Sequence, residues 1–192
     1  MRARLHAFEQ ASRANGPGLR AVVWFQGCTL RCPGCFNPDT HDPQGGYDAD
    51  TARLAADILA LRPTITGLSI SGGEPFEQPE VLLDLLERLD DSGLSRLVFS
   101  GYTLEAIRTL PLGNRILAHL DVLIAGRYIA SQHVGRRLLG SANQRIHLLT
   151  SRHRPGDFSD VPTREAILHR DGTVTLSGIA PLPLAPRRGQ RH

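Results

Sequence analysis

Cysteine is scarce in this sequence: there are three cysteines among 192 residues, and all of them lie between Cys28 and Cys35. An odd number cannot be paired completely in disulfides, and the first 25 residues contain no long apolar stretch of the kind found in secretory signal peptides. A chain of this length also buries about 70% of its unfolded surface without cross-links. We therefore exclude a disulfide-stabilised secreted domain and expect a reducing, cytoplasmic location.

Long hydrophobic runs are absent as well. No apolar stretch approaches the roughly 18 residues that a membrane-spanning helix needs, so we expect no membrane partner. The length fits one domain, which we place at residues 1–178. The last residues, 179–192, are rich in proline and arginine without periodicity, and we expect them to form a disordered tail.

Lysine is missing altogether, since all 22 basic residues are arginine, against 19 acidic residues. The arginines are scattered along the chain, and we expect no nucleic-acid partner. One stretch is locally basic and contains Arg127, Arg136, Arg137, Arg145, Arg152 and Arg154. These arginines either bind an anion or a partner or form a plain solvated face.

Hydrophobic patterning predicts alternating strands and helices. The run 19–27, LRAVVWFQG, is nearly continuous and apolar, which indicates a buried strand that ends just before the cysteines. Helical spacing follows over 48–61 and again over 81–89, with the strand sequence TGLSIS between them. A further cycle consists of RLVFS, GYTLEAIRTL and DVLIAG. This order predicts an α/β fold with a mostly parallel sheet, flat or curled into part of a barrel.

The end of the chain has a different pattern. The sequences EAILHR and TVTLSG flank Asp171 and Gly172, a dipeptide typical of two-residue type I′ turns. We therefore predict a short C-terminal β-hairpin.

The three cysteines have the spacing C-x3-C-x2-C, which is close enough for one loop to surround one inorganic centre. A structural zinc ion needs four ligands, and His41 could complete a Cys3His site. A 4Fe-4S cluster held by Cys28, Cys32 and Cys35 would instead keep one iron open for a substrate. Electron carriers usually close the cluster with four thiolates, so three fit a ferredoxin poorly.

A second motif lies one β/α unit later. The sequence SISGGEP, residues 69–75, places two glycines and a glutamate at the carboxyl end of a predicted strand, the edge where open α/β sheets bind ligands. Glycines allow a ligand to approach the backbone closely, and carbonyl oxygens or Glu74 can accept hydrogen bonds from an ammonium group. Alone this is only a turn; after the cysteine motif it favours a catalytic cofactor site over zinc.

Together these motifs resemble the radical S-adenosylmethionine superfamily, which is similar in the three cysteines and in Gly72, Gly73, Glu74 and Pro75. Further motifs resemble one family within it, the activating proteins of anaerobic (class III) ribonucleoside-triphosphate reductase. These are NGPGLR, CPGCFN, SGYTLEAI, DVLIAGRYI and GSANQRI, which run from about residue 15 to 147. Many superfamily members carry an aromatic residue where Gly34 stands, a departure that this family shares.

The resemblance implies a partial (β/α) TIM-like barrel and an oxidoreductase with one 4Fe-4S cluster, ligated by Cys28, Cys32 and Cys35. It also implies that S-adenosylmethionine binds the open iron and that the turn from Gly72 to Pro75 holds its amino group. Reductive cleavage then yields methionine and a 5′-deoxyadenosyl radical. Phe36 and Asn37 are candidates for the adenosyl pocket, although Phe36 could equally be a core residue.

The implied partner is a large glycyl-radical protein, the anaerobic reductase, with a flavodoxin-like electron donor. Two alternatives stay open: another glycyl-radical enzyme, peptide or small molecule as target, and a non-catalytic zinc or iron-sulfur interaction module.

A few other residues remain as weaker candidates. Arg20 could neutralise a carboxylate or anchor a partner, or be a surface residue. Tyr102 and Asp121 lie near predicted strand ends and hence near the site. Ser141, Asn143 and Gln144 are suited to hold a loop by side-chain hydrogen bonds, and could contact a cofactor or partner.

Overall fold

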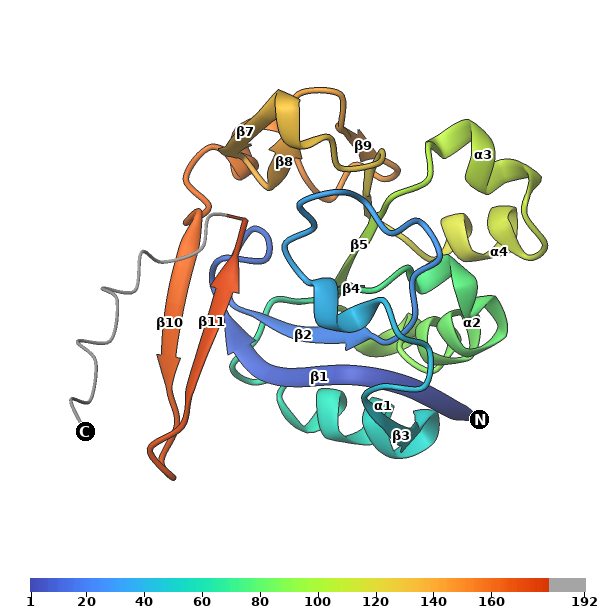
Figure 1. The fold of residues 1–192 in the computed structure, drawn as a ribbon. Coiled ribbons are helices and arrows are strands. Elements are labelled where there is room, and N and C mark those ends of the chain that lie inside the picture. The colour runs from blue at the N-terminus through green and yellow to red at the C-terminus, as the bar shows by residue number, and fades with distance from the viewer. Residues whose placement is uncertain (180–192) are drawn as a thin grey trace.

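A computed structural model describes residues 1–179, and its centre is a seven-stranded sheet in the order β3-β1-β2-β4-β5-β6-β9. Four neighbouring strands in the middle are parallel: β2 (Arg20–Phe25), β4 (Gly67–Gly72), β5 (Ser95–Ser100) and β6 (Val122–Ala125). Figure 1 shows these strands behind the loop that carries the cysteines. Within residues 1–179, no helix has the length and apolar character needed to span a bilayer.

Helices connect the parallel strands as the sequence predicts. They are α1 (Thr51–Ala60), α2 (Pro79–Glu87), α3 (Leu104–Thr109) and α4 (Gly113–Ala118). Asp50 caps α1 by accepting a hydrogen bond from the backbone of Arg53, as expected for an N-cap aspartate. The apolar faces of these helices cover one face of the sheet and form the larger hydrophobic core.

The alternation of side chains along each strand separates two environments. Val23, Ile70 and Leu123 point into the core beneath the helices. Their neighbours Leu97, Val122 and Ile124 point to the other face, where a smaller cluster includes Phe158. The second face of the sheet is therefore only partly covered, and the candidate site lies on it.

Three antiparallel strands extend the parallel part, and the sequence did not predict them. They are β1 (Arg2–Ser12), β3 (Tyr47–Asp50) and β9 (Arg145–Leu148). Strands β3 and β9 end the sheet on its two sides, so among residues 1–179 the sheet is open and not a closed barrel. A curvature like that of a partial TIM-like barrel remains a prediction.

Two small two-stranded sheets complete the fold: β7 (His133–Arg136) with β8 (Leu139–Ser141), and β10 (Arg164–Leu168) with β11 (Val174–Gly178). The second pair is the predicted C-terminal hairpin, which lies beside β1 (Figure 1). Its turn is not the predicted two-residue turn. The His169 carbonyl accepts a hydrogen bond from Gly172, and Gly172 has a left-handed φ of 85°, so the loop holds three residues, 170–172.

The expected tail lies outside the described residues except for Ile179. The backbone N–H of Ile179 still donates to the carbonyl of Thr163, 3.0 Å away, and so continues the hairpin by one residue.

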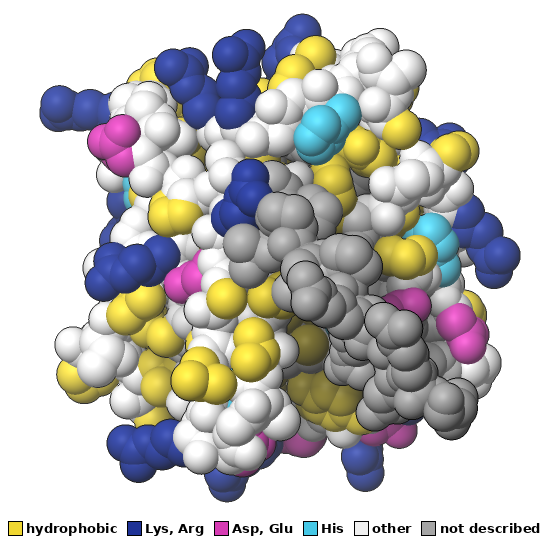
Figure 2. Space-filling model, turned by 60° about the vertical axis from the view of Figure 1, so that its left-hand side comes forward, with side chains coloured by type: hydrophobic (Ala, Val, Ile, Leu, Met, Phe, Trp, Pro, Cys, Tyr) yellow, Lys and Arg dark blue, Asp and Glu magenta, His cyan; other side chains and the backbone are white. Residues whose placement is uncertain are grey.

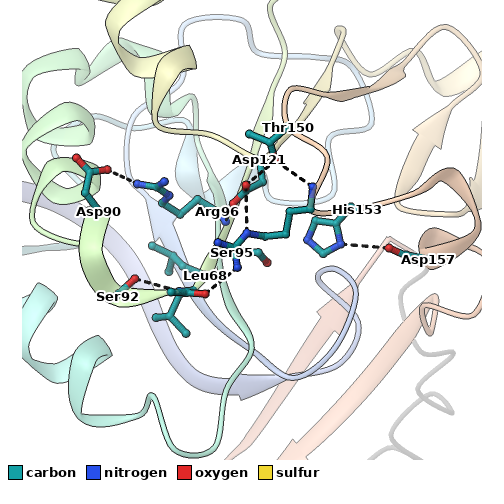
Figure 3. A network of polar contacts seen from close by, with 12 residues as sticks. Leu68, Asp90, Ser92, Ser95, Arg96, Asp121, Thr150, His153 and Asp157 are labelled. Atoms are coloured by element: carbon teal, nitrogen blue, oxygen red, sulfur yellow. Dashed lines mark hydrogen bonds and ion pairs between the residues drawn. The ribbon is translucent and has the colours of Figure 1, made fainter.

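A polar network occupies the amino-terminal ends of the parallel strands (Figure 3). Asp121 accepts hydrogen bonds from the backbone of Arg96 and from the hydroxyl of Thr150. Arg20 is completely buried there and donates to the hydroxyls of Ser69 and Ser95 and to the carbonyls of Leu68 and Ser95. This end of the sheet is held by polar contacts, and the opposite end is left for the site.

Candidate functional site

A cavity of about 280 Å³ lies at the carboxyl ends of the parallel strands. The three cysteine side chains line it, together with the turn after β4 and residues from the ends of β5 and β6. This is the edge at which α/β sheets bind ligands. The predicted site residues that line the cavity are Cys28, Cys32, Cys35, Phe36, Asn37, Gly72, Gly73 and Glu74.

The cysteine loop leaves β2 and returns to the body of the protein through backbone contacts. Gly27 donates to the carbonyl of Thr40 at 2.8 Å, and Cys28 donates to the carbonyl of His41 at 3.3 Å. The side-chain amide of Gln26 donates to the carbonyls of Asp39 and Asp42. These contacts join the two ends of the loop that carries the three thiols.

Burial favours the neutral form of two thiols. Desolvation raises the pKa of Cys28 and of Cys35 above the ordinary value, although backbone hydrogen bonds to each sulfur oppose the shift, two for Cys28 and one for Cys35. For Cys35 this donor is the N–H of Asn37, 3.4 Å away. Without a metal these thiols are therefore neutral at pH 7, and a metal that binds them must displace protons.

The glycines of the second motif bring its turn against the cysteine loop. The backbone N–H of Gly73 donates to the carbonyl of Phe25 at 2.7 Å, and the backbone N–H of Glu74 donates to the carbonyl of Gly27 at 2.8 Å. A Cβ on Gly73 would collide with the backbone of Gly27, and Gly72 has a left-handed φ of 103° against Phe25. The two motifs are therefore in backbone contact, which only glycine permits here.

Glu74 is buried, with 1% of its surface exposed. One carboxylate oxygen accepts from the hydroxyl of Ser100 and the backbone of Phe76, and the other accepts from the backbone of Gly101 at 2.7 Å. Desolvation raises the pKa of Glu74 to about 7 despite these donors. Most of the acceptor capacity of the carboxylate is thus used to join the turn to the end of β5.

Gly34, directly before Cys35, has a left-handed backbone with φ of 74°. A Cβ there would lie 3.3 Å from the Cβ of Ala130. After Cys35, Phe36 packs against Tyr128, with ring centroids 4.7 Å apart. The third cysteine is therefore placed by a glycine-dependent turn and by contact with the segment after β6.

That segment is fastened by the family motif over residues 140–145. Gln144 accepts from the backbone N–H groups of Gly140 and Ser141 and donates to the carbonyl of Gly126 at 2.8 Å. Asn143 donates to the carbonyl of Arg127. The prediction that these polar side chains hold a loop is confirmed, and Gln144 also lines the cavity.

Two other sequence candidates lie away from the cavity. Asp121 directly precedes β6. It therefore lies at the amino ends of the parallel strands, and the cavity lies at their carboxyl ends. Arg20 is neither a surface residue nor a partner anchor: it is fully buried, and desolvation lowers its pKa to about 9. The expectation that Asp121 lies near the site was therefore wrong. Of the interpretations of Arg20, only the neutralisation of a carboxylate has support, because the charge of Asp121 opposes the lowering of its pKa. Tyr102 does lie near the cysteine loop, and burial and the charge of Glu77 raise its pKa.

The sequence did not single out several residues that line the cavity. Trp24 and Phe99 come from strands, where they face the side away from the helices, and Asn15 comes from the turn after β1. Residues 175–179 of the hairpin line it as well. Alternation along β2 and β5 could have indicated Trp24 and Phe99; the hairpin residues depend on a long-range packing that no local pattern reports.

The donor set fits an iron-sulfur cluster better than a zinc ion. Within residues 1–179 no three His, Cys, Asp or Glu side chains converge as around a single metal ion, and His41 is absent from the cavity lining. In a cluster each thiolate binds a different iron, so the thiols of one loop need only face a common space.

Comparison with known proteins agrees with this assignment. Residues 14–147 match the family described as 4Fe-4S single cluster domain. The chain is 31% identical over 153 residues to an anaerobic ribonucleoside-triphosphate reductase-activating protein of Vibrio cholerae, and the match covers 76% of this chain and 97% of that protein. The chain belongs to the glycyl-radical enzyme activases of the radical S-adenosylmethionine superfamily.

Other relatives of this family are longer. The chain is 36% identical over 128 residues to a pyruvate formate-lyase-activating enzyme of Clostridium pasteurianum, a match that covers 63% of this chain and 50% of that protein. It is 27% identical over 146 residues to pyruvate formate-lyase 1-activating enzyme of Escherichia coli, covering 74% of this chain and 58% of that protein. The chain thus spans about half the length of these activating enzymes.

Proposed function

We propose that this chain reductively cleaves S-adenosylmethionine at a 4Fe-4S cluster and generates a glycyl radical on an anaerobic ribonucleoside-triphosphate reductase. The observation that supports this most is the joint lining of one cavity by Cys28, Cys32, Cys35 and the turn at Gly72 and Gly73. The relative with the reductase-activating name also matches over nearly its whole length.

In this proposal Cys28, Cys32 and Cys35 would hold the cluster, and with only three protein ligands the cluster would keep a position for S-adenosylmethionine. When bound, these cofactors supply a one-electron cleavage of the sulfonium bond, giving methionine and a 5′-deoxyadenosyl radical that takes a hydrogen atom from a glycine Cα. The protein residues hold the reactants close together and limit the access of water.

The turn from Gly72 to Pro75 would bind the amino group of S-adenosylmethionine mainly through backbone carbonyls. Glu74 has three protein donors and is buried, so its contribution is to fix the turn and to add negative charge near the ammonium. Phe36 and Asn37 line the cavity and are the proposed contacts for the adenosyl group. The packing of Phe36 on Tyr128 provides an aromatic surface of the kind that adenine stacks on.

A second candidate target is pyruvate formate-lyase. It is favoured by the higher identity, 36%, to an enzyme that activates it, but this chain covers only half of that enzyme. The reductase is the leading target because the match to its activating protein is nearly complete. For the electron we propose a flavodoxin-like donor, as the family resemblance implies, and we propose the cytoplasm as the location.

The test is anaerobic reconstitution with iron and sulfide, followed by reduction in the presence of S-adenosylmethionine. We expect about four irons per chain and release of 5′-deoxyadenosine. When the reductase of the same organism is added, we expect a glycyl-radical signal in electron paramagnetic resonance, whereas pyruvate formate-lyase should give none.

The matched variants are Cys32→Ala, which removes one proposed ligand, and Pro33→Ala, which alters the same loop without removing a thiol. Cys32→Ala should abolish 5′-deoxyadenosine release, and Pro33→Ala should retain it. Product release by Cys32→Ala at the wild-type rate would refute the proposed ligand set.

A further inference from the structure

The hairpin β10–β11 has one edge at the cavity and one edge away from it. Residues 175–179, which form most of β11 and its end, line the cavity together with the three cysteines, and no residue of β10 does. Figure 1 shows β11 as the strand of the hairpin nearer to the central sheet. Among residues 1–179, the edge of β11 that does not pair with β10 therefore borders the candidate active site.

The hydrogen bonds of the hairpin identify which backbone groups lie on that edge. His169 donates to the carbonyl of Thr173, and Ile179 donates to the carbonyl of Thr163, so odd-numbered residues of β11 pair with β10. In an antiparallel pair the residues between them direct their N–H and C=O groups outward. These residues are Val174, Leu176 and Gly178, and their backbone groups make no hydrogen bond to any other residue in 1–179.

The outer face of the same hairpin is apolar and exposed. Leu168, Val174 and Leu176 have 75%, 56% and 41% of their surface exposed, and Leu168 lies directly opposite Val174. Figure 2 looks onto this side of the molecule and shows hydrophobic side chains gathered in the lower half of the view. Exposed apolar side chains beside an unpaired strand edge are typical of a protein-binding surface.

The inner face holds the hairpin in place. The carboxylate of Glu165 accepts from the hydroxyl of Ser12 at 2.6 Å and from the backbone of Arg13, and the hydroxyl of Ser177 accepts from Asn15 at 2.6 Å. The edge of β11 is thus presented by a strand pair that is fixed to the turn after β1. A fixed edge can bind an extended peptide without first being ordered.

We propose that an extended, glycine-containing segment of the glycyl-radical partner binds as an added strand along the free edge of β11. This inference rests on the proposed function, because that function requires a backbone glycine of another protein to enter this cavity. Main-chain hydrogen bonds from Val174, Leu176 and Gly178 hold the segment, and alternate side chains pack on the outer apolar face.

The geometry of an added strand explains why the target is glycine. Successive residues of a strand point to opposite faces, so every second position of the added segment faces inward, as Thr175 and Ser177 do on β11. At an inward position glycine presents a Cα hydrogen to the cavity with no side chain in between. Any other residue would fill that space with its Cβ.

The test compares Leu176→Pro with Ala166→Pro. Leu176 and Ala166 are direct partners in the hairpin, and the N–H of each points away from the other strand, so proline removes one outward donor in each case and no bond between the strands. Only the donor of residue 176 lies on the edge at the cavity. Leu176→Ala controls for the lost side chain.

The readout is the amount of glycyl radical formed on the reductase per 5′-deoxyadenosine released. We expect this ratio to fall about fivefold for Leu176→Pro, the effect of one lost hydrogen bond of typical strength, and to stay near wild type for Ala166→Pro. Equal effects of both prolines, or no effect of either, would overturn the proposal. A wild-type chain that releases no 5′-deoxyadenosine would instead refute the proposed function itself.

Hydrogen exchange provides a test without substitutions. Adding the reductase should slow exchange of the outward amides of Val174, Leu176 and Gly178 and leave residues 164–168 unchanged. Unchanged exchange of these three amides would contradict the proposal. Protection of the same three amides in the absence of the reductase would also contradict it, because the chain itself would then occupy the edge. Two results would show this: protection that disappears when residues 180–192 are removed, or protection that rises with the concentration of this chain alone.

Discussion

Gly34 illustrates how a single residue determines the geometry of the site. Its φ of 74° is a left-handed conformation that costs other residues roughly 1 kcal/mol or more, and a Cβ there would approach Ala130 at 3.3 Å. The same φ of 74° occurs at Gly93, where a Cβ would meet nothing within 4 Å. The two glycines share a backbone strain and differ in their neighbours.

We predict that Gly34→Ala and Gly93→Ala lower the free energy of unfolding by a similar amount, about 1 kcal/mol, in denaturant titrations. Only Gly34→Ala should also lower the number of irons bound after reconstitution, because it displaces Cys35 relative to the segment at Ala130. Equal iron content in both variants would show that the turn at Gly34 does not position the third cysteine.

Glu74 links the site to the pH dependence of stability. Its pKa of about 7 in the folded chain lies above the value of 4.5 for an unperturbed glutamate, so between these values the folded state holds a proton that the unfolded state has lost. The stabilisation is complete below pH 4.5 and is lost as the pH rises through 7.

We therefore predict that the free energy of unfolding falls by about 3 kcal/mol between pH 4.5 and pH 7.5 in the wild type through this group. In Glu74→Gln, which cannot ionise, this fall should be absent whatever the absolute stability of the variant. Chemical denaturation at a series of pH values measures it. Identical slopes for the two proteins would exclude Glu74 as the titrating group.

Local motifs were enough to predict the residues that one loop or turn brings together. The cysteines and the Gly72–Glu74 turn are each set by short spacing, and both line the cavity as expected. Asp121 was misplaced because it lies at the amino end of its strand, whereas the cavity lies at the carboxyl ends. Arg20 lies in the run 19–27 that predicts a buried strand, but its partners Ser69 and Ser95 are distant in sequence, so no local pattern showed that a buried arginine would find acceptors there.

At the scale of elements, Glu77 joins the turn after β4 to the cysteine loop. Its carboxylate accepts from the backbone N–H of Thr29 at 2.9 Å and from the Thr29 hydroxyl at 2.6 Å. Thr29 follows Cys28 directly, so this contact fixes the start of the loop. Hydrogen bonds to a carboxylate are stronger than neutral ones, but the exposure of this pair to solvent weakens them.

We predict that Glu77→Ala accelerates loss of iron to a chelator about fivefold, the effect of roughly 1 kcal/mol of lost loop anchoring. Glu80→Ala is the control, because Glu80 is exposed in the first turn of α2 and its substitution removes the same charge. If the two variants released iron at the same rate, the contact with Thr29 would have no part in holding the loop.

The elements that the sequence predicted are those with regular periodicity. Strands β2, β4, β5 and β6 and helices α1, α2 and α3 lie where patterning placed them. Strand β1 was missed because shifts in register between Leu5 and Ala7 and between Glu9 and Ser12 interrupt its alternation. Strands β7, β8 and β9 have only three or four residues each, which is too short for a period to be recognised.

At the scale of the whole molecule, the two ends of the parallel sheet have different tasks. The carboxyl ends carry the cavity, and the amino ends carry the buried network of Arg20, Ser69 and Ser95. A change in the network should therefore alter stability without altering the chemistry of the site.

We predict that Arg20→Ala lowers the free energy of unfolding by about 3 kcal/mol or more, because it leaves a void and several buried acceptors without donors. Arg53→Ala, at a side chain that is 80% exposed, should change it by less than about 0.5 kcal/mol. In both variants 5′-deoxyadenosine release per bound cluster should equal that of the wild type. A lower value for Arg20→Ala would mean that the two ends are coupled.

The central claim is that three protein thiolates leave one iron of the cluster open for S-adenosylmethionine. Mössbauer spectroscopy of the chain reconstituted with 57Fe, recorded with and without S-adenosylmethionine, tests it most directly. We predict a 4Fe-4S spectrum in which one iron site alone changes when S-adenosylmethionine is added. A spectrum in which no iron site responds, or a purified chain that holds zinc in place of iron, would contradict the account.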